Sequence, residues 1–426
     1  MDNFIQHYLK SCNDIPIYIL FDEYDHFTND ILYRDKDEFI DSVSKQGYIR
    51  KFYEVIKSAT QSGVVDRVFI TGVSPVTLDG LTSGFNILKH LSHHPAYEAM
   101  MGFSEQEVRD LLRLVLENPD REEEVMQEMR EWYNGYRFSV RSQQNIYNSD
   151  MVLYYLDHFK DYQTRPYQML DINIAPDYYK LKQMFQVVDI HRNEQVLEEV
   201  LQNGYVAAPL VEQFNFERGF TKSDFVNFLA YLGNLTIQSI DITGEILFKI
   251  PNKVIEYLYW QYYGDYLERT AHLEEKGIDV QDTIRKMAKY GNYMFFFELV
   301  QKLLKALSNR DFNKFNEKYV KLAMIAYLSQ SDIFDIKSET ELQGGGYPDL
   351  LLFKKSNNPY DHHEFIIELK YLKKEQSSDL ERVKQEAKDQ VLNYYQQEKR
   401  LHSRPYLHLL AVVVIKDEVF VEEVEK

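Results

Sequence analysis

The pattern of apolar positions near the start of the sequence predicts an α/β arrangement. Residues 17–21 (IYILF) form an uninterrupted apolar run, which is typical of a parallel strand covered on both faces. Apolar positions at helical spacing follow over residues 48–62, Gly63 closes that stretch, and residues 67–72 form a second short apolar run. Strand, helix and strand in this order predict a βαβ unit with a right-handed crossover.

The middle of the chain has mainly helical patterns. The pair Ser104 and Glu107 predicts a capping box at a helix start. From residue 151 to about residue 310 we expect helices with one interruption, the paired short strands 235–237 and 246–250. A predicted helix over 225–232 stands directly before this hairpin, and the combination resembles a winged-helix element.

The C-terminal part returns to an α/β pattern, in the order helix, two strands, helix and strand. These elements are predicted at residues 314–329, 349–353, 365–371, 381–398 and 407–415. No Gly/Ser/Pro-rich linker marks a boundary, so the changes of pattern define three predicted domains. They are an α/β module over 1–140, a helical domain with the winged-helix-like element over 141–305, and an α/β domain over 306–426.

Length, composition and charge narrow the class of protein. A chain of 426 residues has room for two to four domains of roughly 100–200 residues each. With 44% apolar residues it has ample material for a core, which excludes a disordered chain. Its 49 Lys+Arg and 67 Asp+Glu give a net charge of −18, which argues against a long-range, non-specific electrostatic binder of nucleic acid.

The single cysteine and the short apolar runs bear on location. One cysteine, Cys12, excludes a disulfide framework and a cysteine-based zinc site, and it indicates a reducing compartment. No apolar run approaches the ~20 residues of a membrane span, and the first residues lack a signal-peptide pattern. By elimination we expect a cytoplasmic protein without a membrane partner.

The sharpest candidate chemistry lies on the two predicted C-terminal strands. Glu368 and Lys370 share one face of their strand, and Asp349 opens the strand before it. If the two strands pair as a hairpin, Asp349 and Glu368 converge with the Leu369 carbonyl into an oxygen-rich site suited to Mg²⁺ or Mn²⁺. Such an ion activates water and stabilises charge on a phosphodiester. Lys370 would orient the water or offset charge in the transition state.

Two further residues extend this candidate site. Glu317 lies in line with the apolar stripe of the preceding helix, where a carboxylate is costly unless it is paired or binds a metal. Gln390 lies on the following helix with Lys384 and Lys388, so that helix is a candidate contact for a phosphate backbone. The alternative interpretation is that Glu368 and Lys370 form an ordinary solvent-facing pair of little energetic value.

A second candidate site lies at the first predicted strand. Its end, Asp22 and Glu23, reads as a Walker B strand, in which the aspartate holds Mg²⁺ and the glutamate polarises water at a nucleotide γ-phosphate. Thr71 ends the next strand, where AAA-type ATPases carry a sensor residue. The alternative is a strand end with solvated carboxylates.

Taken together, these motifs resemble a family of bacterial AAA-ATPase-like proteins with a C-terminal domain of the PD-(D/E)XK nuclease superfamily. The resemblance rests on the FDEYD and FITGVS strings around Asp22 and Thr71, on GFS and WYNGYRF in residues 102–138, and on the C-terminal set. It implies catalytic roles for Asp349, Glu368, Lys370, Glu317 and Gln390, metal binding by Asp349 and Glu368, and nucleotide contacts by Asp22, Glu23 and Thr71. The order αβββαβ of the superfamily fits residues 314–415.

Two departures from that family bear on function. The sequence contains no G-x-x-x-x-G-K-[ST] motif, so the backbone amides and lysine that grip nucleotide phosphates are missing. We therefore expect the α/β module to be incomplete, with ATP hydrolysis only if an N-terminal fragment or partner chain supplies that loop. The turn at residues 344–348 also lacks an arginine that relatives tend to carry.

Two functions from different classes follow. The first is a metal-dependent nuclease, using Mg²⁺ or Mn²⁺ and acting on DNA or RNA, attached to the incomplete ATPase-like module. The second is a non-catalytic interaction or regulatory protein with idle nuclease-like and ATPase-like folds.

Overall fold

The computed structural model describes most of the chain in two compact units. The described residues are 15–43, 47–73, 75, 85–170, 181–186, 189–211, 214, 220–271, 280–308, 316–343, 345–355 and 362–426. The first unit combines residues up to 163 with 170–255, and the second combines 164–169 with 256–426. Cys12 and Gly344 lie outside the described residues. The three domain boundaries read from the sequence stay predictions.

The N-terminal βαβ unit is confirmed. Strands β1 (Ile17–Phe21) and β2 (Val65–Ile70) pair in parallel, and helix α4 (Tyr48–Gln61) lies between them in sequence and packs against β2. Two helices were not predicted, α2 (His26–Arg34) and α3 (Lys36–Val43).

The expectation that the first strand is covered on both faces is wrong for the described residues. Tyr18 and Leu20 on β1 are 64% and 77% exposed, while Ile17 and Ile19 pack with Val65. The reason is physical: a sheet of only two strands, with α4 on one face, leaves its other apolar face without a covering layer in the described part of the chain.

The middle region of the first unit is helical with one small sheet. The capping box at Ser104 is confirmed at the start of α6 (Glu105–Val115). The other helices are α7 (Glu122–Tyr133), α8 (Ser149–Tyr162), α10 (Ile190–Asn203) and α11 (Lys222–Tyr231). The strands are β3 (Val206–Ala208), β4 (Thr236–Ile240) and β5 (Ile246–Lys249), in the antiparallel order β3-β5-β4. The predicted helix and hairpin are therefore present, with a third strand beside β5.

The second unit is an α/β domain with a five-stranded mixed sheet. Its strands are β6 (Phe334–Ser338), β7 (Leu350–Lys354), β8 (Glu364–Leu372), β9 (Leu407–Ile415) and β10 (Glu418–Val424), in the order β10-β9-β8-β7-β6. Its helices are α13 (Val280–Tyr290), α14 (Met294–Ser308), α15 (Glu317–Leu328) and α16 (Leu380–Gln397). Most of α12 (Lys253–Ala271) also belongs to this unit. Only β8 and β9 run parallel, and α16 connects them.

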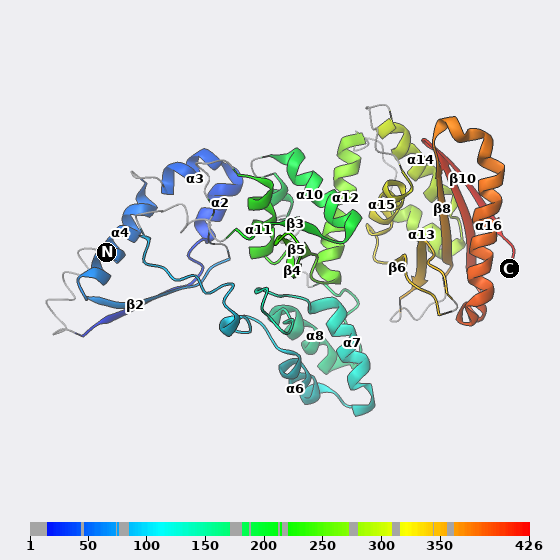
Figure 1. Ribbon diagram of the computed structural model, residues 1–426. Coiled ribbons are helices and arrows are strands. Elements are labelled where there is room, and N and C mark those ends of the chain that lie inside the picture. The colour runs from blue at the N-terminus through cyan, green and yellow to red at the C-terminus, as the bar shows by residue number, and fades with distance from the viewer. Residues whose placement is uncertain are drawn as a thin grey trace. The chain divides into compact units, whose positions relative to one another are not determined.

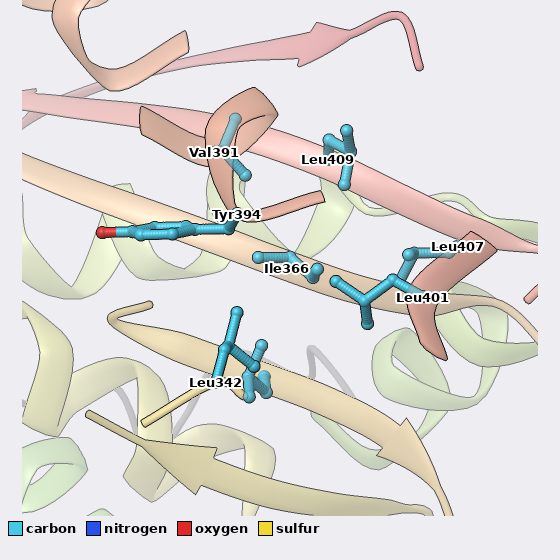
Figure 2. Close-up of a cluster of buried hydrophobic side chains, with 8 residues drawn as sticks. Leu342, Ile366, Val391, Tyr394, Leu401, Leu407 and Leu409 are labelled. Carbon is cyan, nitrogen blue, oxygen red and sulfur yellow. The ribbon is translucent and has the colours of Figure 1, made fainter. Parts of the chain in front are cut away.

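Helices cover both faces of this sheet. Figure 1 shows α16 along one face and α13, α14 and α15 on the other. On the α16 face, Ile366 and Leu409 from neighbouring strands pack against Val391 and Tyr394 of the helix (Figure 2). The Tyr394 hydroxyl points out of this apolar cluster, away from Leu401 and Leu407. No helix in the described ranges is long and apolar enough to cross a membrane.

Candidate active site

The candidate site lies where β7 separates from β8. The antiparallel pairing of these strands ends at Leu350 and Ile367, but β8 continues to Leu372. Beyond that point the backbone groups on this edge of β8 lack a strand partner and need another one. Asp349, directly before β7, supplies it: its Oδ2 accepts the backbone N–H of Leu369 at 2.9 Å. The hairpin predicted from the sequence is thus present, and it brings Asp349 beside Glu368.

Glu368, which is buried, and Lys370, which is half-buried, form an ion pair on the face of β8 that α16 covers. Lys370 Nζ donates to Glu368 Oε1 at 2.6 Å, and the Glu368 side chain is only 4% exposed. The alternative of a solvent-facing pair is therefore wrong. Burial is the main cause of a raised pKa for Glu368, and the Asp349 charge adds to it. Burial also disfavours the Lys370 ammonium, but Glu368, together with the charges of Glu317 and Asp349, offsets this and raises the pKa of Lys370.

Glu317 reaches the same place from the other face of the sheet. It occupies the first turn of α15, whose N-cap Asn316 accepts the Tyr319 N–H at 2.8 Å. Burial and the nearby Asp349 charge raise the pKa of Glu317, against the opposing effects of Lys370 and Lys321. The structure therefore brings Glu317 together with Asp349, Glu368 and Lys370, as the sequence predicted.

Lys321 belongs to this cluster, although it was not among the residues predicted from the sequence. It lies one turn after Glu317 on α15, is buried, and its Nζ is 3.3 Å from Asp349 Oδ1. The same ammonium also contacts the Glu339 carboxylate. The signal in the sequence was a single lysine inside an otherwise apolar helix, over residues 319–328.

The helix α16 contributes a residue other than the predicted one. Gln390 is exposed, and no hydrogen bond in the described part of the chain joins its side chain to Asp349, Glu368 or Lys370. Tyr394, one turn later on the helix, is the residue near the carboxylates. Burial and the charges of Glu368 and Asp349 raise its pKa to about 12. An aromatic at this spacing looks like simple core in a sequence, and its ring indeed packs in the apolar cluster (Figure 2).

The predicted phosphate contacts of this helix are occupied within the protein. Lys384 Nζ lies 3.1 Å from Glu422 on β10, and Lys388 pairs with the same carboxylate. Both lysines would have to exchange that partner for a phosphate.

The donor atoms present fit a small divalent cation. Mg²⁺ is commonly held by one or two carboxylates, with water and substrate oxygens filling its other positions. Asp349 and Glu368 provide two buried carboxylates, and Glu368 Oε2 has no hydrogen-bond partner among the described residues. No group of three or more His, Cys, Asp or Glu side chains in those ranges is arranged to hold a metal by itself. The two carboxylates therefore suit an ion whose remaining coordination positions are filled by water or substrate oxygens.

The N-terminal site is also assembled in part. Thr71 Oγ1 donates to Asp22 Oδ1 at 2.5 Å, so the two residues predicted to act together are adjacent across β1 and β2. Glu23 is exposed and adopts a positive φ of 49°, which is uncommon for a residue other than glycine. Asp25 was not predicted, yet it is fully buried and accepts the Val73 N–H at 2.9 Å.

Comparison with known proteins finds one family match near each end of the chain. Residues 1–82 match a family described as predicted AAA-ATPase, and residues 315–424 match the PD-(D/E)XK nuclease superfamily. A protein described as uncharacterized, from the vnfD 5′ region of Azotobacter chroococcum mcd 1, is 32% identical over 152 residues. That match covers 35% of this chain and 26% of the relative, so it spans about a quarter of the relative's length. No solved structure matches the chain.

Proposed function

The chain carries a PD-(D/E)XK nuclease superfamily domain at residues 315–424 and an AAA-ATPase-like segment at residues 1–82, and we propose that it is a metal-dependent nuclease. Its substrate would be DNA or RNA. The observation that carries the proposal is the convergence of Asp349, Glu368 and Lys370 at the unpaired edge of β8. Nucleases of this superfamily generally use divalent metal ions, and nucleic acid is the partner that the domain implies.

The residues of the site divide into three roles. Asp349 and Glu368 would hold Mg²⁺ or Mn²⁺, which when bound supplies Lewis-acid stabilisation of phosphodiester charge and lowers the pKa of water. Lys370 Nζ would donate to the attacking water or to the charged phosphoryl oxygens. Glu317, with its raised pKa, is a candidate to hold a proton near the same atoms.

The charges of the site suggest how a protein of net negative charge could bind a polyanion such as nucleic acid. Four carboxyl groups, those of Asp349, Glu368, Glu317 and Glu339, lie near the two ammonium groups of the site, so the site is acidic before a cation binds. A divalent cation offsets this negative charge without a basic surface. We therefore expect weak, metal-assisted affinity for nucleic acid instead of long-range attraction.

A direct assay tests this proposal. The purified chain should cleave single- or double-stranded DNA or RNA with Mn²⁺ or Mg²⁺ and lose that activity in EDTA. Asp349→Asn should abolish cleavage, whereas Asp335→Asn should not, since Asp335 is a partly exposed acid on the neighbouring strand β6, paired with Lys337. Equal cleavage by wild type and Asp349→Asn would refute the assignment.

One observation favours a second function, a non-catalytic interaction module. Lys321 and Lys370 already pair with Asp349 and Glu368, so both carboxylates are neutralised without any ion. An idle site of this kind would bind no divalent cation. Calorimetry with Mn²⁺ separates the two functions, because binding that is lost in Glu368→Ala requires a working metal site.

For the N-terminal segment we propose a nucleotide-binding role only in combination with a phosphate-binding loop from elsewhere. Asp22, Glu23 and Thr71 would then supply the Walker B and sensor groups. The support is the hydrogen bond between Thr71 and Asp22. Equilibrium binding of a fluorescent ATP analogue by the chain, alone and with a loop-bearing partner, tests it.

A further inference from the structure

Lys321 is a buried cation held between two acids that differ greatly in exposure. Its side chain is 8% exposed and lies in the apolar part of α15. One partner, Asp349, is buried with it at 3.3 Å, while the other, Glu339, is 66% exposed. A buried ammonium needs a carboxylate partner, because the cost of removing it from water is otherwise uncompensated.

The position of Glu339 is built into the backbone. It follows β6 directly and has a φ of 49°, in the left-handed region where a residue with a side chain is strained. Its N–H donates to the carbonyl oxygen of Pro348 at 3.2 Å, immediately before Asp349. Such a conformation persists only where surrounding structure holds it, and here it brings a second carboxylate to Lys321. The hydrogen bond from Lys321 lowers the pKa of Glu339, which keeps that carboxylate charged.

Lys321 and a divalent cation would compete for the same carboxylate. Asp349 Oδ2 is engaged by the Leu369 N–H, and Lys321 contacts Oδ1. A divalent cation that binds Asp349 Oδ1 would therefore have to displace the Lys321 ammonium from that oxygen. Without a second acid, displacing that ammonium would leave a buried, unpaired charge.

We propose that Lys321, which contacts both Asp349 and Glu339, is a resident counter-cation of Asp349 that gives up Asp349 and keeps Glu339 as its partner when a divalent cation binds. This inference rests on the proposed metal-dependent function and adds a positioning residue that sets the metal affinity of the site. Lys321 fixes and neutralises Asp349 in the cation-free protein. Glu339 is the acceptor that makes the exchange possible.

Calorimetric titration of the full chain with MnCl₂ tests the first half of the proposal. Lys321→Met should bind Mn²⁺ roughly fivefold to tenfold more tightly than wild type, on the scale of one charge removed at this separation. Lys337→Met is the matched control, because it removes one lysine charge from the neighbouring strand β6, where Lys337 pairs with Asp335. It should leave Mn²⁺ affinity unchanged. Thermal unfolding in EDTA is the second readout: Lys321→Met should be less stable than wild type and gain more from Mn²⁺.

Glu339→Gln tests the second half and remains informative if Lys321→Met fails to fold. With its alternative acceptor removed, Lys321 should hold Asp349 more firmly and weaken Mn²⁺ binding severalfold. In the Lys321→Met background the same substitution should have little effect, since the exchange no longer exists. An equal effect of Glu339→Gln in both backgrounds would overturn the exchange. Mn²⁺ affinity unchanged or weakened in Lys321→Met would overturn the inference while leaving the proposed function intact. Absence of Mn²⁺ binding by wild type would overturn both.

Discussion

The carboxylate of Asp349 accepts the backbone N–H of Leu369, two residues beyond the last pairing of β7 with β8. This hydrogen bond replaces the strand partner that β8 lacks there, and it fixes Asp349 beside Glu368. The site is therefore a consequence of sheet topology. Because β8 extends beyond the end of β7, some of its backbone groups have no strand partner, and acidic side chains from adjacent elements lie at this edge. Glu317 approaches the same edge from α15.

Two substitutions of Lys370 should distinguish the effect of its positive charge from the effect of its side-chain geometry. Lys370→Ala removes the donor to Glu368 Oε1, and cleavage should fall by roughly 10²–10³-fold, as when one transition-state donor is lost. Lys370→Arg keeps the charge but changes its shape, and it should recover only part of the rate. Initial rates at saturating Mn²⁺ measure both. Lys373→Ala, an exposed lysine three residues on, is the control, and an equal loss in that variant would count against a specific role for Lys370.

Tyr394 should matter more than Gln390. Tyr394→Phe keeps the ring in its apolar cluster but removes the hydroxyl near Glu368 and Asp349, so activity should fall severalfold with little change in stability. Gln390→Ala alters an exposed side chain and should have the smaller effect in a cleavage assay on a short oligonucleotide. If Gln390→Ala proves the more damaging, α16 acts through contacts with substrate that the protein alone does not form.

The raised pKa of Glu368 predicts a pH-dependent stability in EDTA. The ordinary pKa of a glutamate carboxyl group is 4.5, and at pH values above this the folded protein holds the Glu368 proton more tightly than the unfolded chain does. The stability that this proton contributes is full below pH 4.5 and is lost as the pH rises through the folded-state pKa. Wild type should therefore lose stability relative to Glu368→Gln over that window. Urea midpoints measured at intervals from pH 4 to 7 should show the trend, and parallel curves for the two proteins would contradict it.

Asp25 should be a structural residue of the N-terminal unit. It is fully buried, and its carboxylate accepts the Val73 N–H at 2.9 Å and the Asn29 amide at 2.8 Å. Asp25→Ala would leave these two N–H donors without their acceptor and should lower the free energy of unfolding by roughly 1–3 kcal/mol. Asp22→Ala, at an exposed strand end, should cost clearly less. Urea denaturation followed by circular dichroism compares the stability of the two variants. Equal losses of stability would show that the buried hydrogen bonds of Asp25 do not contribute more than the exposed Asp22 does.

The sequence predicted those parts of the fold whose apolar patterns are uninterrupted. The strand predicted over 407–415, around the apolar run 409–415, is β9 to the residue, and 17–21 is β1, because continuous apolar runs identify strands within a parallel pair. Strands β6 and β10 were missed, since polar residues fill much of both. Short, half-exposed strands at a sheet edge are defined by their partners more than by their own pattern.

The candidate site was predictable where strand register decides it. Glu368 and Lys370 share a face because they are two residues apart, and Asp349 follows from the hairpin. Lys321 was missed because its partners lie on other elements, 18 and 28 residues away in sequence. Tyr394 was missed because a buried aromatic on a helix has the same pattern whether or not its hydroxyl faces a charged site.

The central claim is that Asp349, Glu368 and Lys370 form a metal-dependent nuclease site. The most direct test is the initial rate of Mn²⁺-dependent phosphodiester cleavage by wild type beside Glu368→Gln, which is nearly isosteric and removes only the charge of one proposed ligand. We predict cleavage by wild type that EDTA abolishes, and a loss of roughly 10²-fold or more in the variant. Equal rates in the two proteins, or no cleavage of DNA or RNA by wild type with Mn²⁺, would contradict the claim.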